Sequence, residues 1–250
     1  MQRWQLRPAA DLDLPMAARL ASPLRETGLA ALAGRLFWRA LCHRYLCARH
    51  RLTVAGAEHL PAAPPFVMVA NHASHLDSLV LADCLPLRLA DRVFPLAAGD
   101  HFFADPARAA FTAMALNALP LARRGARPRQ LAALRRRLTE DGCAYILFPE
   151  GTRARDGVIA PFRAGLGRLV AGTPVPVVPC HIEGAYAAWP ASAPLPRRRP
   201  IAVAIGKPMT FAAVADDKDG WRRIAAAAEA AVRSLAAGAA APNSGAGPRA

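Results

Sequence analysis

Residues 66–80 have the sequence FVMVANHASHLDSLV, and this stretch decides the fold. Its first five residues are apolar, and a run of this length predicts a buried β-strand. A polar turn follows, and Asp77 then opens an apolar segment that predicts a helix. His72 therefore lies where a strand crosses into a helix, with the Asp77 carboxylate five positions further along the chain.

The polar turn carries side chains that can move a proton. Histidine suits a general base because its unperturbed pKa is about 6.5, and a carboxylate bonded to the other ring nitrogen fixes the tautomer. His72 and Asp77 are therefore candidates for a base and its orienting partner. Two other interpretations remain open from these residues alone. One is a metal site built from His72, His75 and Asp77, and the other is a capped helix whose histidines have no function.

Further strands and helices alternate along the chain, which predicts an α/β sheet with helices on its faces. The Ala/Gly/Pro/Ser-rich tail, residues 237–250, is expected to be disordered. The expected strands are 66–70, 93–98, 118–122, 143–148, 175–182 and 201–205, with a short strand at the start of 53–65, and the expected helices are 28–52, 77–85, 105–116, 128–140, 162–170 and 215–236.

The composition predicts a globular protein with a positive surface. The 250 residues are 54% hydrophobic and 20% charged, which is typical of a folded domain with a sizeable core. The formal net charge of +14 favours anionic membranes, nucleic acid or phosphorylated substrates as partners. No platform of aromatic and basic side chains accompanies the charge, so nucleic-acid binding is not expected.

The cysteines and the hydropathy pattern indicate an intracellular location. The five cysteines have neither zinc-site spacing nor the pattern of a disulfide scaffold, which predicts reduced thiols in the cytoplasm. The N-terminal residues lack the apolar core of a signal peptide. No run is long, apolar and proline-free enough to predict a bilayer span.

Residues 28–52 predict an amphipathic helix. One interpretation is a helix that lies on anionic lipid, where each basic residue adds about 1 kcal/mol. The other is a surface helix packed on the core through its apolar side, with solvated arginines. On a helical wheel one side carries Leu29, Ala33, Leu36, Phe37, Ala40 and Leu41, and the other carries Arg35, Arg39, His43, Arg49 and His50.

A second polar segment, FPEGTR at residues 148–153, follows an expected buried strand. In α/β folds, loops at this end of a strand bind ligands. Arg153 offers a planar fork for a phosphate, and Gly151 lets a backbone approach closely. Glu150 is expected to orient Arg153 or a substrate hydroxyl. An ordinary salt-bridged turn is the alternative interpretation.

The motifs together resemble those of the glycerolipid acyltransferase family, typified by lysophosphatidic acid acyltransferase. A third basic element, Arg123-Arg124-Gly125, contributes to the resemblance, although by itself it is indistinguishable from a solvated turn. The resemblance covers about residues 50–210, and the motifs occur in the family's order and spacing: Asn71-His72-(four residues)-Asp77, Arg124-Gly125, Phe148-Pro149-Glu150-Gly151-Thr152-Arg153 and Val175-Pro176-Val177-Val178-Pro179.

The resemblance implies a role for each motif. His72 is the expected general base, Asp77 its partner, and no metal ion is expected. His75 occupies a variable position of the motif, so it is expected to line the pocket or the surface. The strand that ends at Pro179 is expected to line the acyl-donor side. Acceptor binding is implied for Asn71, Arg124, Glu150, Gly151, Thr152 and Arg153, with Arg124 helping to hold a phosphate.

The resemblance also implies a reaction without an acyl-enzyme. His72 would take the proton of a lysophospholipid hydroxyl, and that oxygen would attack the thioester of acyl-CoA or acyl-carrier protein. No cofactor is expected beyond this co-substrate. The expected acceptor is 1-acyl-glycerol-3-phosphate, which gives phosphatidic acid. A different lysolipid, such as lyso-ornithine lipid, is one alternative, and a non-catalytic basic membrane-binding protein is another.

The expected fold class is a single α/β domain, with a mixed central sheet flanked by helices and an N-terminal helical membrane-associating segment. Residues 1–52 form the lead-in and amphipathic helix, residues 53–236 the acyltransferase domain, and residues 237–250 the tail. Because the family commonly rests on membranes through N-terminal helices, the resemblance favours the lipid interpretation of residues 28–52. The protein is expected to be peripheral on the cytoplasmic face of the inner membrane.

Overall fold

The computed structural model describes residues 13–15, 18–19, 22, 25, 29–98, 105–121 and 128–240. Within these ranges, seven strands form one sheet in the order β1-β7-β6-β2-β5-β3-β4. Every neighbouring pair is parallel except β6 and β7, so the sheet is mixed, as predicted. The strands are β1 Thr53–Ala55, β2 Phe66–Ala70, β3 Val93–Ala98, β4 Leu119–Leu121, β5 Ala144–Leu147, β6 Val177–Glu183 and β7 Ala202–Ile205.

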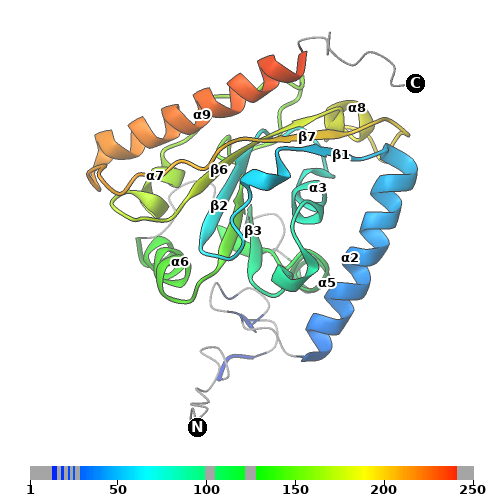
Figure 1. Ribbon diagram of the computed structural model, residues 1–250. Helices are drawn as coiled ribbons and strands as arrows, with labels where there is room; N and C mark the ends of the chain where they lie inside the picture. Colours follow the sequence, from blue (N-terminus) through cyan, green and yellow to red (C-terminus); the bar gives the residue numbers. More distant parts are fainter. Residues whose placement is uncertain are drawn as a thin grey trace.

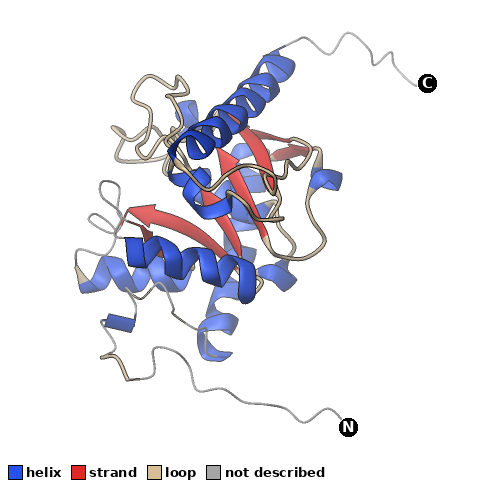
Figure 2. Ribbon diagram, turned by 90° about the vertical axis from the view of Figure 1, so that its left-hand side faces the viewer, coloured by secondary structure: helices blue, strands red, loops and turns tan. Residues whose placement is uncertain are grey.

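Helices cover both faces of the sheet (Figures 1 and 2). One hydrophobic cluster joins the sheet to α6, α7 and α9, and a second joins it to α2, α3 and α8. The helices in the described ranges are α2 Leu29–His50, α3 Asp77–Asp83, α5 Pro106–Ala115, α6 Pro128–Glu140, α7 Gly165–Val170, α8 Ala185–Ala188 and α9 Lys218–Ala240, with 3-10 turns η1 Ala57–His59 and η2 Leu87–Leu89.

Strand β2 lies at the centre of the sheet, between β5 and β6. Both faces of a central parallel strand are covered, which explains why all five of its residues are apolar and buried. Val69 is paired with Leu147 of β5, and Ala70 with Cys180 of β6. The segments that follow β2 and β5 therefore leave the sheet side by side, at the edge where α/β folds place ligand sites.

Most expected elements are present with small shifts in their ends. Strands β2 and β3 and helix α6 have the predicted bounds. Helix α7 begins three residues later than predicted, at Gly165. Helix α9 continues to Ala240, four residues past the predicted end, because three alanines there favour the helix. The rest of the predicted tail, residues 241–250, and most of the predicted lead-in lie outside the described residues.

The orientation of α2 differs from the interpretation in which its apolar side packs on the core. Phe37 is 73% exposed and Leu41 is 48% exposed, whereas Arg35 is only 3% exposed. Leu46, which falls off the apolar side of the wheel, is fully buried. The helix therefore packs inward through Arg35, Arg39 and Leu46. The interpretation with solvated arginines is wrong for these two arginines, whereas Arg49 is exposed.

The inward arginines of α2 bind carbonyl groups near α3, which explains this orientation. The Arg39 guanidinium donates to the carbonyls of Ala82 and, at 2.6 Å, Leu85. These carbonyls lie at and just beyond the C-terminal end of α3, where helix carbonyls have fewer intrahelical partners, and the Ala82 carbonyl also accepts the Leu85 N–H at 3.1 Å. Arg35 donates to the Ala90 carbonyl at 3.4 Å, and burial lowers the pKa of Arg35 to about 10 although Asp91 opposes the shift.

Candidate active site

His72 and Asp77 form a close pair at the end of β2. The His72 Nδ1 and Asp77 Oδ2 atoms are 2.7 Å apart. The same carboxylate oxygen accepts the backbone N–H groups of Ala73 and Ser74 at 2.7 and 2.8 Å, which folds the turn around the carboxylate. Because a carboxylate only accepts, Nδ1 donates to Asp77, and Nε2 is the nitrogen that can take a proton.

The Phe148 ring holds the other side of the imidazole. The His72 and Phe148 rings are stacked, with centroids 4.1 Å apart and planes inclined by 17°. Asp77 is 1% exposed, while His72 is partly exposed. The imidazole is thus fixed by a carboxylate at one edge and an aromatic ring on one face. The sequence placed Phe148 in a motif but gave it no role.

Asn71 fixes the end of β2 to β6. Its Nδ2 donates to the Ile182 carbonyl at 3.0 Å, and its Oδ1 accepts the Ile182 N–H at 2.8 Å. The side chain is buried, and it is not among the residues that line the cavity described below. In the structure Asn71 therefore joins β2 to β6 next to His72, and the acceptor-binding role expected from the sequence stays a prediction.

Glu150 joins its loop to the His72 backbone. One carboxylate oxygen accepts the His72 N–H at 2.7 Å, and the other accepts the Ala160 N–H at 3.0 Å. The expected partner, Arg153, takes no part in these bonds. Glu150 is 2% exposed, and burial raises its pKa while the two N–H donors oppose the shift. A second link runs from the Ala154 N–H to the His72 carbonyl at 2.7 Å.

The loop between these two links presents Gly151, Thr152 and Arg153 to a cavity. Gly151 has a φ of +72°, and an added Cβ would lie 3.0 Å from the Arg163 guanidinium carbon. Glycine is required here both for the left-handed backbone and for the approach of Arg163. Arg153 is half-buried, and its Nη1 contacts the ring nitrogens of His75 at 2.5 and 2.9 Å.

The cavity has a volume of about 930 Å³ and brings the predicted motifs together. His72 and Arg153 both line it, so a base and a cation face the same space. Most of the wall is apolar, and α2, α3 and α5 contribute to it. Sequence reasoning missed several lining residues, because nothing in their local sequence marks them: Trp38, Leu41, Tyr45, Leu116, Leu131, Arg163, Arg168 and Trp189.

Two predicted elements do not contribute to this cavity in the described residues. Arg124 lies within 122–127, outside the described ranges, so its role stays a prediction. Strand β6 supplies no lining residue, because Val177 and Val178 are buried in the two hydrophobic clusters. Among the described residues, no three His, Cys, Asp or Glu side chains converge in a way that could hold a metal ion.

The chain is similar to a known protein family. A family model described as Acyltransferase matches residues 51–183, which include the His72–Asp77 pair and the Arg153 loop. The chain belongs to the acyltransferase family. The matched region covers strands β1 to β6 of this acyltransferase, so the resemblance noted from the motifs is confirmed.

Several curated relatives have names that specify a substrate. The chain is 32% identical over 129 residues to 1-acyl-sn-glycerol-3-phosphate acyltransferase alpha of Mus musculus, an alignment covering 52% of this chain and 44% of that protein. It is 32% identical over 138 residues to the chloroplastic 1-acyl-sn-glycerol-3-phosphate acyltransferase BAT2 of Brassica napus, covering 54% and 38%. The alignments thus span less than half the length of these relatives.

A solved structure has the same fold. The crystal structure of the 1-acyl-sn-glycerophosphate (LPA) acyltransferase PlsC from Thermotoga maritima aligns with a TM-score of 0.62 and 23% sequence identity. The alignment covers 84% of this acyltransferase and 80% of that chain. At this identity the likeness establishes the α/β architecture.

Proposed function

We propose that this acyltransferase moves a fatty acyl group from acyl-CoA or acyl-carrier protein to the free hydroxyl of a lysophospholipid. The proposed acceptor is 1-acyl-glycerol-3-phosphate, and the product is phosphatidic acid. One observation carries the proposal: His72, which is paired with Asp77, and Arg153 face a single cavity with largely apolar walls. A base, a cation and room for hydrocarbon are the groups that a phosphorylated lysolipid acceptor requires.

The reaction follows from the orientation of His72. Nε2 takes the proton of the acceptor hydroxyl while the oxygen attacks the thioester carbonyl carbon. Asp77, bonded to Nδ1, stabilises the imidazolium that forms. The tetrahedral intermediate then collapses, the carbon–sulfur bond breaks, and the thiolate leaves and receives the proton from His72. The products are an ester and a free thiol, and the enzyme returns to its starting state without an acyl-enzyme.

The acceptor side rests on the arginines of the cavity. Arg153 and Arg163 both line the cavity, and the Arg163 guanidinium packs close to Gly151. A guanidinium binds a phosphate with two parallel hydrogen bonds. The names of the curated relatives specify an acceptor that carries such a phosphate. These two observations favour 1-acyl-glycerol-3-phosphate over an acceptor without a phosphate, such as lyso-ornithine lipid.

Replacing Arg153 with leucine is expected to lower kcat/KM for 1-acyl-glycerol-3-phosphate by about 10- to 100-fold, since a hydrogen bond to a charged group contributes about 1.5–3 kcal/mol. The matched control is Arg155→Leu, because Arg155 is exposed in the same loop and does not line the cavity. Steady-state assays with varied acceptor would measure both variants. Equal kcat/KM values for Arg153→Leu and wild type would exclude the phosphate-binding role.

The acceptor itself is tested with a panel of lysolipids. Purified protein is incubated with 1-acyl-glycerol-3-phosphate, other lysophospholipids and lyso-ornithine lipid, each with acyl-CoA and with acyl-carrier protein as donor. We expect the highest kcat/KM for 1-acyl-glycerol-3-phosphate. Acylation of non-phosphorylated acceptors alone would contradict the proposed phosphate contact and favour the other lysolipids.

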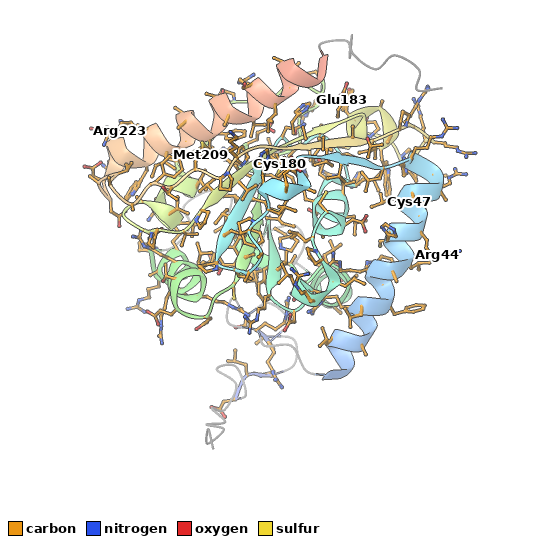
Figure 3. The ribbon with its side chains drawn as sticks, viewed as in Figure 1. Arg44, Cys47, Cys180, Glu183, Met209 and Arg223 are labelled. Atoms are coloured by element: carbon orange, nitrogen blue, oxygen red, sulfur yellow. The ribbon has the colours of Figure 1, made fainter. Side chains whose placement is uncertain are left out.

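We also propose that the protein binds the cytoplasmic face of an anionic membrane peripherally through α2. No described helix is both long and apolar enough to cross a bilayer. Phe37 and Leu41 of α2 are exposed, although Leu41 also lines the cavity. Arg44 and Arg49 are exposed near the C-terminal end of the helix. Figure 3 shows Arg44 on this helix at the edge of the molecule. Exposed apolar residues flanked by arginines favour an interfacial helix.

A double substitution, Phe37→Glu with Leu41→Glu, is expected to weaken binding to anionic vesicles by about tenfold or more, because burying each side chain contributes about 1.5–3 kcal/mol. The matched control is Val158→Glu with Leu195→Glu, which places the same charges at residues that are 62% and 73% exposed elsewhere. Flotation with vesicles of phosphatidylcholine and phosphatidylglycerol gives the bound fraction. Equal losses in both double variants would show that charge, and not α2, accounts for the effect.

A further inference from the structure

His75 lies in direct contact with Arg153. Arg153 Nη1 is within hydrogen-bonding distance of the His75 ring, 2.5 Å from Nδ1 and 2.9 Å from Nε2. Both side chains line the cavity. The two residues belong to the loops that follow β2 and β5, and the contact joins the two halves of the site beyond the backbone links already described.

The imidazole of His75 is itself held in place from the other side. Its ring lies against the Trp189 ring, with centroids 4.9 Å apart and planes inclined by 45°. The His75 backbone N–H donates to the Trp189 carbonyl at 3.3 Å, and the ring itself bonds to the backbone of Ala191. The Ser74 hydroxyl donates to the same Trp189 carbonyl at 2.9 Å. The histidine is therefore a fixed surface on which Arg153 rests.

The contact requires a neutral imidazole. A neutral ring has one donor and one acceptor nitrogen, so it can donate to a carbonyl and still accept from a guanidinium. A protonated ring has two donors and would place two cations in contact. The pKa of His75 is lowered by burial and then by Arg153 and His72, while the Ala191 backbone bond and Asp77 oppose the shift.

We propose that His75 is a positioning residue, which orients the Arg153 guanidinium toward the phosphate of the acceptor by accepting a hydrogen bond from it. This role rests on the proposed function, because it assumes a phosphorylated acceptor. His75 touches neither the reacting hydroxyl nor the thioester in this scheme. Its removal therefore affects acceptor binding and leaves the chemical step, carried by His72, unchanged.

The proposed contact makes acceptor binding depend on pH. The charged groups that face His75 are Arg153, His72 and Asp77, and Arg163 lies across the same cavity. Because the pKa of His75 is lowered from its ordinary value of about 6.5, the imidazole stays neutral at and above that pH. As pH falls through the lowered pKa, His75 becomes a cation and repels Arg153, so the KM for the acceptor rises.

The test compares His75→Leu, which removes the acceptor nitrogen, with His75→Gln, whose amide oxygen can still accept from Arg153. Kinetics are measured from about pH 5 to about pH 8, with acceptor and donor varied separately. At about pH 7.5, His75→Leu is expected to raise the acceptor KM by about tenfold, with kcat and the donor KM within about twofold of wild type. His75→Gln is expected to restore the acceptor KM and to reduce its rise at low pH. Thermal unfolding of each variant reports whether it is folded.

Protonation of the acceptor phosphate affects all three proteins alike, so the difference between their pH profiles isolates His75. An unchanged acceptor KM in His75→Leu, or a fall in kcat without a change in KM, would overturn the positioning role while leaving the proposed function intact. A similar loss in a folded His75→Gln variant would also overturn it. Inactivity of wild type toward every phosphorylated acceptor would overturn the proposed function itself and this role with it.

Discussion

Replacing His72 with alanine is expected to lower kcat by about 10²- to 10⁴-fold, the range that a positioned general base contributes. The hydroxyl of the acceptor would then lose its proton only to water. Asp77 would keep its bonds to the Ala73 and Ser74 N–H groups, so the turn should still form. The KM for the acceptor should change little, because Arg153 and the apolar walls remain. Steady-state acyl transfer with acyl-CoA and 1-acyl-glycerol-3-phosphate measures both constants.

The matched control for this variant is His59→Ala. His59 bonds to the Ile205 carbonyl at 2.8 Å and does not line the cavity, so the substitution should leave acyl transfer near the wild-type rate. Vesicle binding of His72→Ala should equal that of wild type, since α2 is untouched. A folded His72→Ala protein with full acyl transfer would exclude the proposed mechanism. Vesicle binding by a wild-type protein without any acyl transfer would favour the non-catalytic alternative.

Replacing Asp77 with asparagine is expected to lower kcat by about 10²- to 10⁴-fold while the fold is retained. One oxygen, Oδ2, accepts all three bonds, from His72 and from the Ala73 and Ser74 N–H groups. An amide oxygen in that place can keep these contacts and the His72 tautomer. The substitution removes the negative charge that stabilises the imidazolium, so it separates charge from geometry.

The matched control is Asp83→Asn, at the other end of α3. Asp83 pairs with the exposed His43 at 3.0 Å and does not line the catalytic cavity. Asp77→Asn should also lower the unfolding free energy by about 1–3 kcal/mol, because the new amide N–H lies where the buried Oδ1 has no partner. Urea unfolding and kcat are measured on both variants. A kcat of Asp77→Asn close to that of Asp83→Asn would show that the charge is not used.

The elements that could be predicted are those whose signal is local. Five consecutive buried apolar residues identify β2, and Pro128 marks the first turn of α6 because proline fits a helix start. The His72–Asp77 pair is also local, since the turn needs only five residues to bring the two together. Each of these features is determined by residues that are close together in the sequence.

The other contacts of the site depend on which strands are neighbours in the sheet, and no short sequence pattern predicts that order. Asn71 meets Ile182 across 111 residues of sequence, and Glu150 meets the His72 backbone across 78. Both contacts exist because β2 lies between β6 and β5. The side of α2 that packs inward was equally unpredictable, because carbonyls at the end of α3 decide it.

The inward arginines of α2 also change what the charge of the protein means. The formal value of +14 counts every arginine equally, yet Arg35 is buried and Arg39 is bonded to two carbonyls. Ions in solution screen charges at the surface, so we expect the ionic-strength dependence of the proposed membrane binding to come from exposed residues such as Arg44 and Arg49. Both Arg39 bonds are donated by one guanidinium nitrogen, Nη2. On this helix, Arg35 and Arg39 therefore stabilise the packing of the fold. Only the exposed arginines are available for the proposed electrostatic attraction to lipid.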